Sequence, residues 1–173
     1  MRILVEGRPG SGKSTIARRL ADTLAGLRIP VSGFVTEEIR ERGRRVGFSI
    51  ERLGGESGVL AHVDLPGPPR VGRYGVDLSA LERLAIPALR EATDRDVVII
   101  DELGKMELAS QPFRDAVSAI FDRPVRVVAT VHTARHPFTD ALKRRPGVET
   151  MRLTAAMRDE LPQLLAARLR STR

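Results

Sequence analysis

Residues 7–14 read Gly7-Arg8-Pro9-Gly10-Ser11-Gly12-Lys13-Ser14 and match the pattern G-x-x-x-x-G-K-[ST] at every fixed position. Ile3 to Glu6 precedes them and reads as a short buried strand, and a helical pattern from about Lys13 to Leu27 follows. Glycines let successive backbone N–H groups turn inward on an anion, and the helix N-terminus adds its positive end. The stretch therefore predicts a phosphate-binding loop between a strand and a helix.

This loop assigns roles to its polar side chains. Lys13 is expected to place its ammonium between the β- and γ-phosphates of a nucleotide, and Ser14 to offer its hydroxyl to Mg²⁺. Lys13 is thus a candidate catalytic residue and Ser14 a candidate metal ligand. The residues that we expect to hold the phosphates are Gly7, Arg8, Pro9, Gly10, Ser11, Gly12, Lys13, Ser14 and Thr15.

A second motif begins with Val97 to Ile100, an unbroken β-branched run of the kind that a parallel strand covered on both faces requires. The run ends in Asp101-Glu102, at the strand end where ligands bind in α/β sheets. Asp101 fits a metal-linked carboxylate, and Glu102 fits a base that orients and deprotonates a water. The segment that we expect to border the nucleotide comprises Val98, Ile99, Ile100, Asp101, Glu102, Leu103, Gly104 and Lys105.

Two further candidate catalytic residues each have a structural alternative. Lys105 lies three residues beyond Glu102, where it is placed to approach the same phosphates; the alternative is a surface pair with Glu107. Thr130 stands near the end of a predicted strand, where its hydroxyl faces the γ-phosphate or the attacking water; the alternative is a strand residue without a ligand role.

The remaining patterns predict an α/β fold with a mainly parallel sheet, because strands alternate with helices. Residues 31–63 read as a β-meander that begins with a core strand at 31–36, and we place an antiparallel insertion at about 37–75 within a single domain, 1–173. Further strands are predicted at 97–100, 125–131 and 148–153, and further helices from Ser79, over 110–122 and over 159–169.

Composition limits the class of protein. The 173 residues are 42% hydrophobic and contain no Cys, which excludes disulfides, thiolate nucleophiles and Cys-based zinc sites. No apolar run approaches the roughly 20 residues of a membrane span, so we expect a cytoplasmic protein without a membrane partner, and a monomer. The net charge of +7 favours an anionic partner, which is a nucleotide, a nucleic acid or an acidic surface, while aromatic residues at 3% provide few stacking platforms for single-stranded nucleic acid.

The two motifs together resemble the cancer-related nucleoside-triphosphatase family, whose second motif reads D-E-[IL]-G-K-M-E-L and here reads Asp101-Glu102-Leu103-Gly104-Lys105-Met106-Glu107-Leu108. Further segments resembling the family are 33–40, 47–48, 71–76 and Thr154 to Asp159, so the resemblance spans nearly the whole chain. It implies a RecA-like sheet of core order 5-1-4-3-2 and a slow Mg²⁺-dependent NTPase of broad base preference. One departure is Met157-Arg158-Asp159, where the family commonly has Asn-Arg-Asp.

The leading hypothesis is therefore hydrolysis of a nucleoside triphosphate to the diphosphate and phosphate. The arginine that stabilises the transition state is not singled out: Arg135, Arg144 and Arg145 lie where related kinases carry a lid, Arg158 is a fourth candidate, and a solvated basic loop is the alternative for the first three. Because the chain has no Asn, the guanine-reading N-K-x-D motif is absent, and we expect weak discrimination among bases.

Two other functions stay open at this point. A small-molecule P-loop kinase would use the 37–75 region to hold its phosphoryl acceptor, although kinases exclude the water that Glu102 is placed to activate. A nucleotide-gated RNA- or protein-binding module would explain the basic charge.

Overall fold

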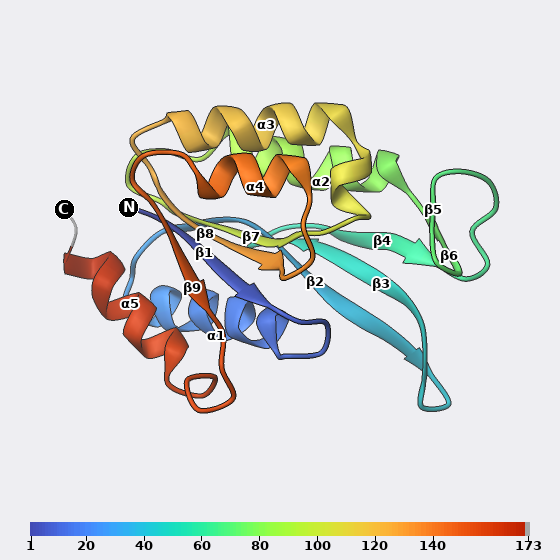
Figure 1. Ribbon diagram of the computed structural model, residues 1–173, viewed down its shortest axis with the longest axis horizontal. Coiled ribbons are helices and arrows are strands. Elements are labelled where there is room, and N and C mark those ends of the chain that lie inside the picture. The colour runs from blue at the N-terminus through green and yellow to red at the C-terminus, as the bar shows by residue number, and fades with distance from the viewer. Residues whose placement is uncertain (172–173) are drawn as a thin grey trace.

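The structure is a computed structural model that describes residues 1–171, and these residues form one nine-stranded sheet with helices on both faces. Helices α2, α3 and α4 cover one face, and α1 and α5 cover the other (Figure 1). The strands are β1 (Arg2–Gly7), β2 (Val31–Glu41), β3 (Arg44–Arg52), β4 (Ser57–His62), β5 (Arg70–Val71), β6 (Tyr74–Val76), β7 (Val97–Leu103), β8 (Arg126–His132) and β9 (Val148–Arg152). The helices are α1 (Lys13–Gly26), α2 (Leu78–Arg90), the 3₁₀ turn η1 (Glu107–Ala109), α3 (Gln111–Asp122), α4 (Pro137–Lys143) and α5 (Leu161–Ser171).

One half of the sheet is parallel and carries the phosphate-binding loop at the end of its β1. Its strands lie in the order β9-β1-β8-β7-β2, with parallel pairing throughout. Numbered by their place among these five strands in the chain, the order is the expected 5-1-4-3-2. The β-branched run of β7 is buried on both faces between β2 and β8, as its composition predicted.

The other half is antiparallel and occupies the region where we expected an antiparallel insertion, at about 37–75. The change of direction occurs within β2, which pairs with β7 in parallel over Val31–Phe34 and with β3 in antiparallel fashion from Phe34 to Glu41. The sheet then continues through β4, β6 and β5, so these strands extend the same sheet and form no separate unit. The last pair departs from a meander, since β6 lies next to β4 and β5 is at the edge.

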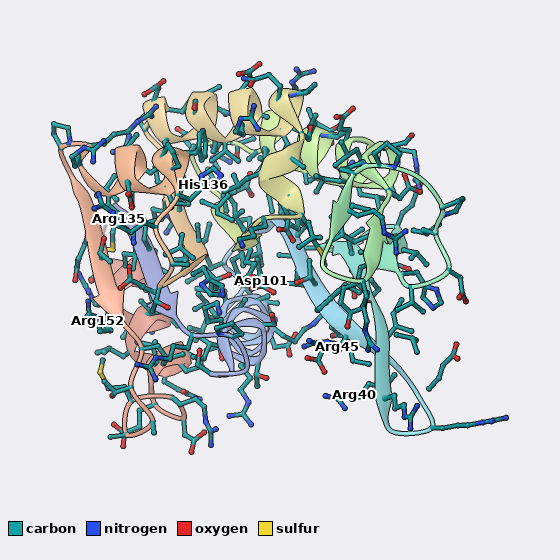
Figure 2. The ribbon with its side chains drawn as sticks, turned by 45° about the vertical axis from the view of Figure 1, so that its right-hand side comes forward. Arg40, Arg45, Asp101, Arg135, His136 and Arg152 are labelled. Atoms are coloured by element: carbon teal, nitrogen blue, oxygen red, sulfur yellow. The ribbon has the colours of Figure 1, made fainter. Side chains whose placement is uncertain are left out.

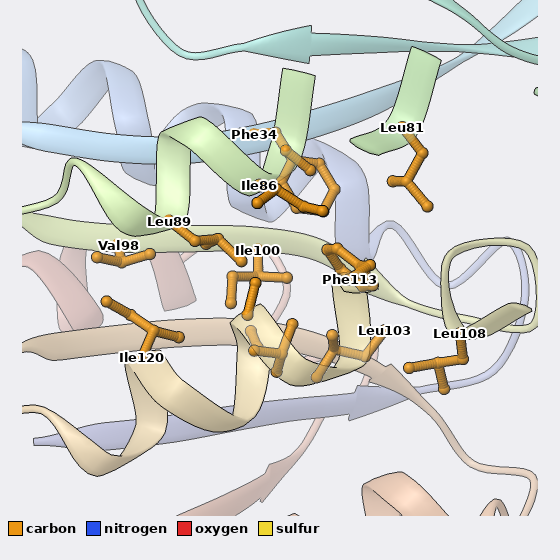
Figure 3. Close-up of a cluster of buried hydrophobic side chains, with 14 of the residues drawn as sticks. Phe34, Leu81, Ile86, Leu89, Val98, Ile100, Leu103, Leu108, Phe113 and Ile120 are labelled. Carbon is orange, nitrogen blue, oxygen red and sulfur yellow. The ribbon is translucent and has the colours of Figure 1, made fainter. Parts of the chain in front are cut away.

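Two apolar layers hold the helices on the sheet. Figure 3 shows the layer beneath α2 and α3, where Phe34 and Phe113 meet edge to face with ring centroids 5.7 Å apart. The other layer lies under α1 and α5 and includes Ile16, Leu20 and Leu165. Gly33 permits the close pairing of β2 with β7: its φ is +104°, and a Cβ there would lie 1.9 Å from the carbonyl oxygen of Ile99.

Two helices begin at side chains that cap their first turn, and one of them starts a residue earlier than the sequence predicted. Ser110 caps α3, because its hydroxyl accepts a hydrogen bond from the Phe113 N–H at 3.1 Å. Helix α2 begins at Leu78, one residue before the predicted start at Ser79, and is capped by Asp77, whose carboxylate accepts from the Ala80 N–H at 2.9 Å. Over the described residues, none of the helices combines the length and apolar character needed to cross a membrane.

Candidate nucleotide site

The phosphate-binding loop has the backbone that its glycines predicted. Gly10 and Gly12 take left-handed φ angles of 73° and 93°, and Gly12 stands directly before α1. The Lys13 side chain is only 6% exposed, and its Nζ donates to the carbonyl oxygens of Gly7 and Arg8, both at 3.1 Å. The loop thus holds an ammonium in place at the N-terminus of a helix, where an anion is favoured.

The two carboxylates after the β-branched run lie in an irregular part of β7. Ile100 pairs with Ala129 and Leu103 with Val131, so Asp101 and Glu102 together face the single residue Thr130 of β8. Such an irregularity re-aims side chains that would otherwise alternate across the sheet. It brings Asp101 and Glu102 to the carboxyl edge of the parallel strands, beside the loop.

Asp101 is fully buried and surrounded by hydroxyl groups. Its Oδ1 accepts from the Thr130 hydroxyl at 2.6 Å, and its Oδ2 accepts from the Thr36 hydroxyl and N–H at 3.2 and 3.3 Å. The Ser14 side chain also acts on this carboxylate by lowering its pKa. Burial raises the pKa of Asp101 above its ordinary value, and the hydrogen bonds from Thr130, Ser14 and Thr36 oppose that rise.

This arrangement suits a hard divalent cation, because Ser14 and Asp101 offer oxygen atoms side by side. Within residues 1–171, no three His, Asp or Glu side chains converge closely enough to hold a metal ion by themselves. An ion bound at Ser14 and Asp101 would therefore complete its shell with phosphate oxygens and water, as Mg²⁺ usually does.

Glu102 is the carboxylate closest to the loop lysine among the described residues. Its Oε2 lies 3.4 Å from Lys13 Nζ, and 27% of its side chain is exposed. Burial raises the pKa of Glu102, the Lys13 ammonium lowers it, and the neighbouring Asp101 raises it again, with a net rise. A carboxylate whose pKa lies above its ordinary value is a stronger base toward water.

Glu107 is a part of the site that the sequence analysis missed. It lies at the start of η1 and is buried, 4% exposed, and its Oε2 accepts from the Gly104 N–H at 3.2 Å. A Cβ on Gly104 would lie 2.9 Å from both Glu102 Oε1 and Glu107 Oε2, so the two carboxyl groups flank this glycine. Burial, and then the charge of Glu102, raise the pKa of Glu107 well above its ordinary value.

Lys105 does not form the surface pair with Glu107 that the sequence left open as the alternative. Lys105 is exposed and lines the same cavity as the loop, whereas the Glu107 carboxyl points inward to Gly104, so the two do not form a surface pair. Thr130 is buried, and its hydroxyl is engaged by Asp101. It therefore has a role as a partner of the candidate metal ligand, which neither sequence interpretation anticipated.

The four arginines that the sequence left as candidates lie in different places. Arg135 lines the cavity, is 88% exposed and pairs with Asp140 at 3.2 Å. Arg145 is tied to α3 through Asp122 at 2.9 Å, and Arg144 is an exposed residue after α4. Arg158 packs on the loop itself, since its Cδ lies 3.0 Å from the position of a Cβ on Gly12.

A cavity of about 1130 Å³ opens beside the phosphate-binding loop. Its walls include Gly12, Lys13 and Ser14 of the loop, Glu102 and Glu107, and side chains from the antiparallel half of the sheet. Figure 2 shows Asp101 in the middle of this region, with Arg135 on one side and Arg45 on the other. The 5-1-4-3-2 parallel sheet, the loop after its β1 and the carboxylate pair after β7 together define a P-loop nucleotide-binding hydrolase.

Comparison with known proteins agrees with this class. A family model described as NTPase matches residues 2–166, and the chain belongs to this NTPase family. The nucleoside-triphosphatase THEP1 of Thermotoga petrophila is 45% identical over 162 residues, covering 93% of this chain and 88% of that protein. The cancer-related nucleoside-triphosphatase homolog of Mus musculus is 37% identical over 185 residues, covering 99% and 97% of the two chains.

Solved structures show the same fold. The crystal structure of THEP1 from the hyperthermophile Aquifex aeolicus superposes with a TM-score of 0.87 at 37% identity, covering 98% of this chain and 99% of that one. The solution structure of a human cancer-related nucleoside triphosphatase gives a TM-score of 0.86 at 35% identity, covering 99% and 98%. The resemblance drawn from the two motifs is therefore confirmed at the level of the family.

Proposed function

We propose that this chain hydrolyses nucleoside triphosphates to the diphosphate and inorganic phosphate, with Mg²⁺ and with little preference among bases. The observation that carries the proposal is the placement of the Glu102 carboxylate 3.4 Å from the Lys13 ammonium, in one cavity with the phosphate-binding loop. The relatives support the reaction, because their names describe them as nucleoside-triphosphatases.

In the proposed reaction, the loop binds the phosphates and Glu102 activates the attacking water. The N–H groups of residues 8–15 and the Lys13 ammonium attract the phosphate oxygens and stabilise the charge that develops on them. Glu102, beside Lys13, accepts a proton from the water that attacks the γ-phosphorus, and its raised pKa favours that transfer. Lys105, exposed at the rim of the same cavity, adds a second positive charge toward the phosphates.

Ser14 and Asp101 would hold Mg²⁺, which when bound neutralises phosphate charge. Neighbouring side chains act on the Asp101 carboxylate in two ways. Thr130 and Thr36 fix both oxygens of the Asp101 carboxylate by hydrogen bonds, so its orientation does not depend on the ion. The Ser14 side chain acts on the same carboxylate by lowering its pKa. Thr130 is thereby a positioning residue in the proposal.

Weak base discrimination follows from what lies beside the loop. A pocket of about 230 Å³ between the first turns of α1 and residues 158–159 is lined by Gly12, Thr15, Ile16, Arg19, Arg158 and Asp159. Planar guanidinium groups stack on any base, because every base has a π-face. We assign this pocket to the base and ribose. Met157, which replaces the Asn common in the family, packs into the apolar layer under α1 and α5 instead of facing this pocket.

Phosphate release tests the proposal directly. Purified protein is incubated with ATP, GTP, CTP or UTP, with and without Mg²⁺, and with no phosphoryl acceptor present. We expect Mg²⁺-dependent release from all four, with rates that differ by less than about tenfold, or about 1.4 kcal/mol of barrier. Release that is absent until an alcohol is added would refute hydrolysis and favour a kinase, and a hundredfold preference for one base would refute the weak discrimination.

A further inference from the structure

The large cavity extends well beyond the groups that a triphosphate needs. Ligand pockets usually span about 300–1,000 Å³, and this one encloses about 1130 Å³ without the separate pocket beside Arg158. Its far end, which we call the outer lobe, is walled by β2–β6 and the turn after β7. The residues of the outer lobe are Glu38, Arg40, Arg45, Phe48, Leu60, Val71, Gly72, Tyr74, Leu103, Met106 and Leu108.

One wall of the outer lobe is apolar. Strands β3, β4, β5 and β6 contribute one side chain each, namely Phe48, Leu60, Val71 and Tyr74. Phe48 and Tyr74 meet edge to face with centroids 5.3 Å apart. Phe48, Val71 and Met106 are only partly buried where they pack on the core, so part of their surface remains to cover a ligand. Apolar surface of this kind binds an apolar ring or chain.

The edge of the lobe beside this apolar wall carries excess positive charge. Arg40 and Arg45 share the single acid Glu38, one guanidinium on each carboxylate oxygen, at 2.6 and 2.8 Å. This cluster of three has a net charge of +1, and both arginines remain about half exposed, at 56% and 43%. Lys105, with no ion pair among the described residues, adds another cation on the cavity wall. An anionic group complements this edge.

Arg45 is held in position before any ligand arrives. Its guanidinium lies 5.1 Å from the Phe48 ring centroid and donates from Nε to the Tyr74 hydroxyl at 3.1 Å. A cation that is fixed by several partners loses little conformational freedom on binding, which favours affinity. Figure 2 shows Arg40 of β2 and Arg45 of β3 on the hairpin that borders this end of the cavity, across Asp101 from Arg135.

From these observations we propose that the outer lobe is a second ligand site, and that it takes a small organic anion with an apolar ring or chain. The anionic group lies at Arg40 and Arg45, and the apolar part lies on Phe48, Val71 and Met106. The proposal rests on the proposed function only for the place of the nucleotide, which occupies the loop and the pocket beside Arg158. Both ligands are therefore expected to bind at once.

Two fluorescent probes of matched shape test the site. We would titrate the full chain with 8-anilino-1-naphthalenesulfonate, an anion, and with N-phenyl-1-naphthylamine, which is uncharged. We expect saturable binding of the anion at one site per chain, and Arg45→Gln should weaken it by about tenfold while changing the uncharged probe by less than about twofold. Arg44→Gln, an exposed neighbour outside the cavity, is the matched control and should change neither.

An apolar variant and a nucleotide complete the test. Phe48→Ser should weaken both probes, whereas Val59→Ser, which removes an exposed apolar side chain on β4 outside the cavity, should weaken neither. Saturating Mg²⁺ and a non-hydrolysable ATP analogue should leave the anion bound. If Arg45→Gln loses its fold by circular dichroism, Arg40→Gln replaces it.

Three outcomes would overturn the proposal: displacement of the anion by the ATP analogue, equal effects of the Arg44 and Arg45 substitutions, or equal affinity for the charged and uncharged probes. None of these measurements involves turnover. A failure of nucleotide hydrolysis therefore refutes the proposed function and does not affect the proposal of a second ligand site. A failure of probe binding refutes the second site and does not affect the proposed function.

Discussion

Replacing Glu102 by Gln isolates the proton-accepting role of this side chain. The amide has the size of the carboxylate and keeps an oxygen that can accept from Lys13 Nζ, which lies 3.4 Å from Oε2 in the native protein. The loop and the Asp101 hydrogen bonds do not involve this group, so the change removes one charge and one base and little else. We therefore expect the fold and the nucleotide affinity to persist.

The expected loss of turnover in Glu102→Gln follows from the role of Glu102 as a general base. A positioned base contributes about 10²–10⁴-fold to a rate, and 10²-fold corresponds to about 2.7 kcal/mol of barrier. Affinity for a non-hydrolysable ATP analogue should stay within about threefold of the native value, or rise, because Glu102 no longer repels the phosphates. Single-turnover phosphate release and equilibrium binding, measured on the same preparation, separate these two effects.

The matched control is Glu91→Gln. Glu91 is a surface glutamate, 62% exposed, that pairs with Arg52 far from the loop in sequence. It should retain native turnover, because exposed ion pairs contribute little. Single-turnover rates for Glu102→Gln within threefold of the native protein would refute the assignment of Glu102 as the base, whatever happens to affinity.

Three more substitutions probe the rest of the site. Lys13→Ala should weaken binding of the ATP analogue and lower turnover together, and a loss of turnover with native affinity would contradict its place at the phosphates. Thr130→Val removes the buried hydroxyl that donates to Asp101 at 2.6 Å, so the free energy of unfolding in urea should fall by about 1–3 kcal/mol; a change below about 0.5 kcal/mol would show that the bond contributes little. Glu107→Gln keeps an acceptor for the Gly104 N–H. Because the folded protein raises the pKa of Glu107, native stability falls as pH rises above the ordinary value of 4.5, so thermal midpoints should favour the variant at pH 8.5 and agree at pH 4; equal midpoints at both pH values would refute a protonated Glu107.

Local pattern was enough to predict the parallel half and its loop. The glycines at 7, 10 and 12 predict the loop, and the β-branched run at 97–100 predicts a buried strand. Because crossover connections between parallel strands are right-handed, few strand orders then remain possible. The family resemblance supplied the order 5-1-4-3-2, which the structure confirms. The pattern over 31–63 indicated a β-meander, but such patterns do not name the neighbouring strand, so the continuity of the antiparallel strands with the main sheet was not predictable.

The sequence did not predict the contacts that Glu107 and Arg158 make in the folded protein. Glu107 entered the sequence analysis only as a surface partner of Lys105 in the alternative interpretation, and its burial arises from the turn after β7 folding back on Gly104. Its position between Met106 and Leu108, both apolar, was the one signal available. Arg158 reaches Gly12 across nearly the whole length of the chain, and no local pattern encodes such a contact.

The pairing of β2 means that the antiparallel half of this protein is not a removable module. Thr36, which binds Asp101, stands two residues before Glu38 of the outer lobe on one continuous strand, so the two ends of the cavity share a rigid support. Helix α2 packs on β2, β3 and β4, and excising residues 42–76 would strip apolar cover from its inner face. Attempts to graft this extension onto another NTPase, or to trim it from this one, should therefore yield an insoluble chain and not a minimal enzyme.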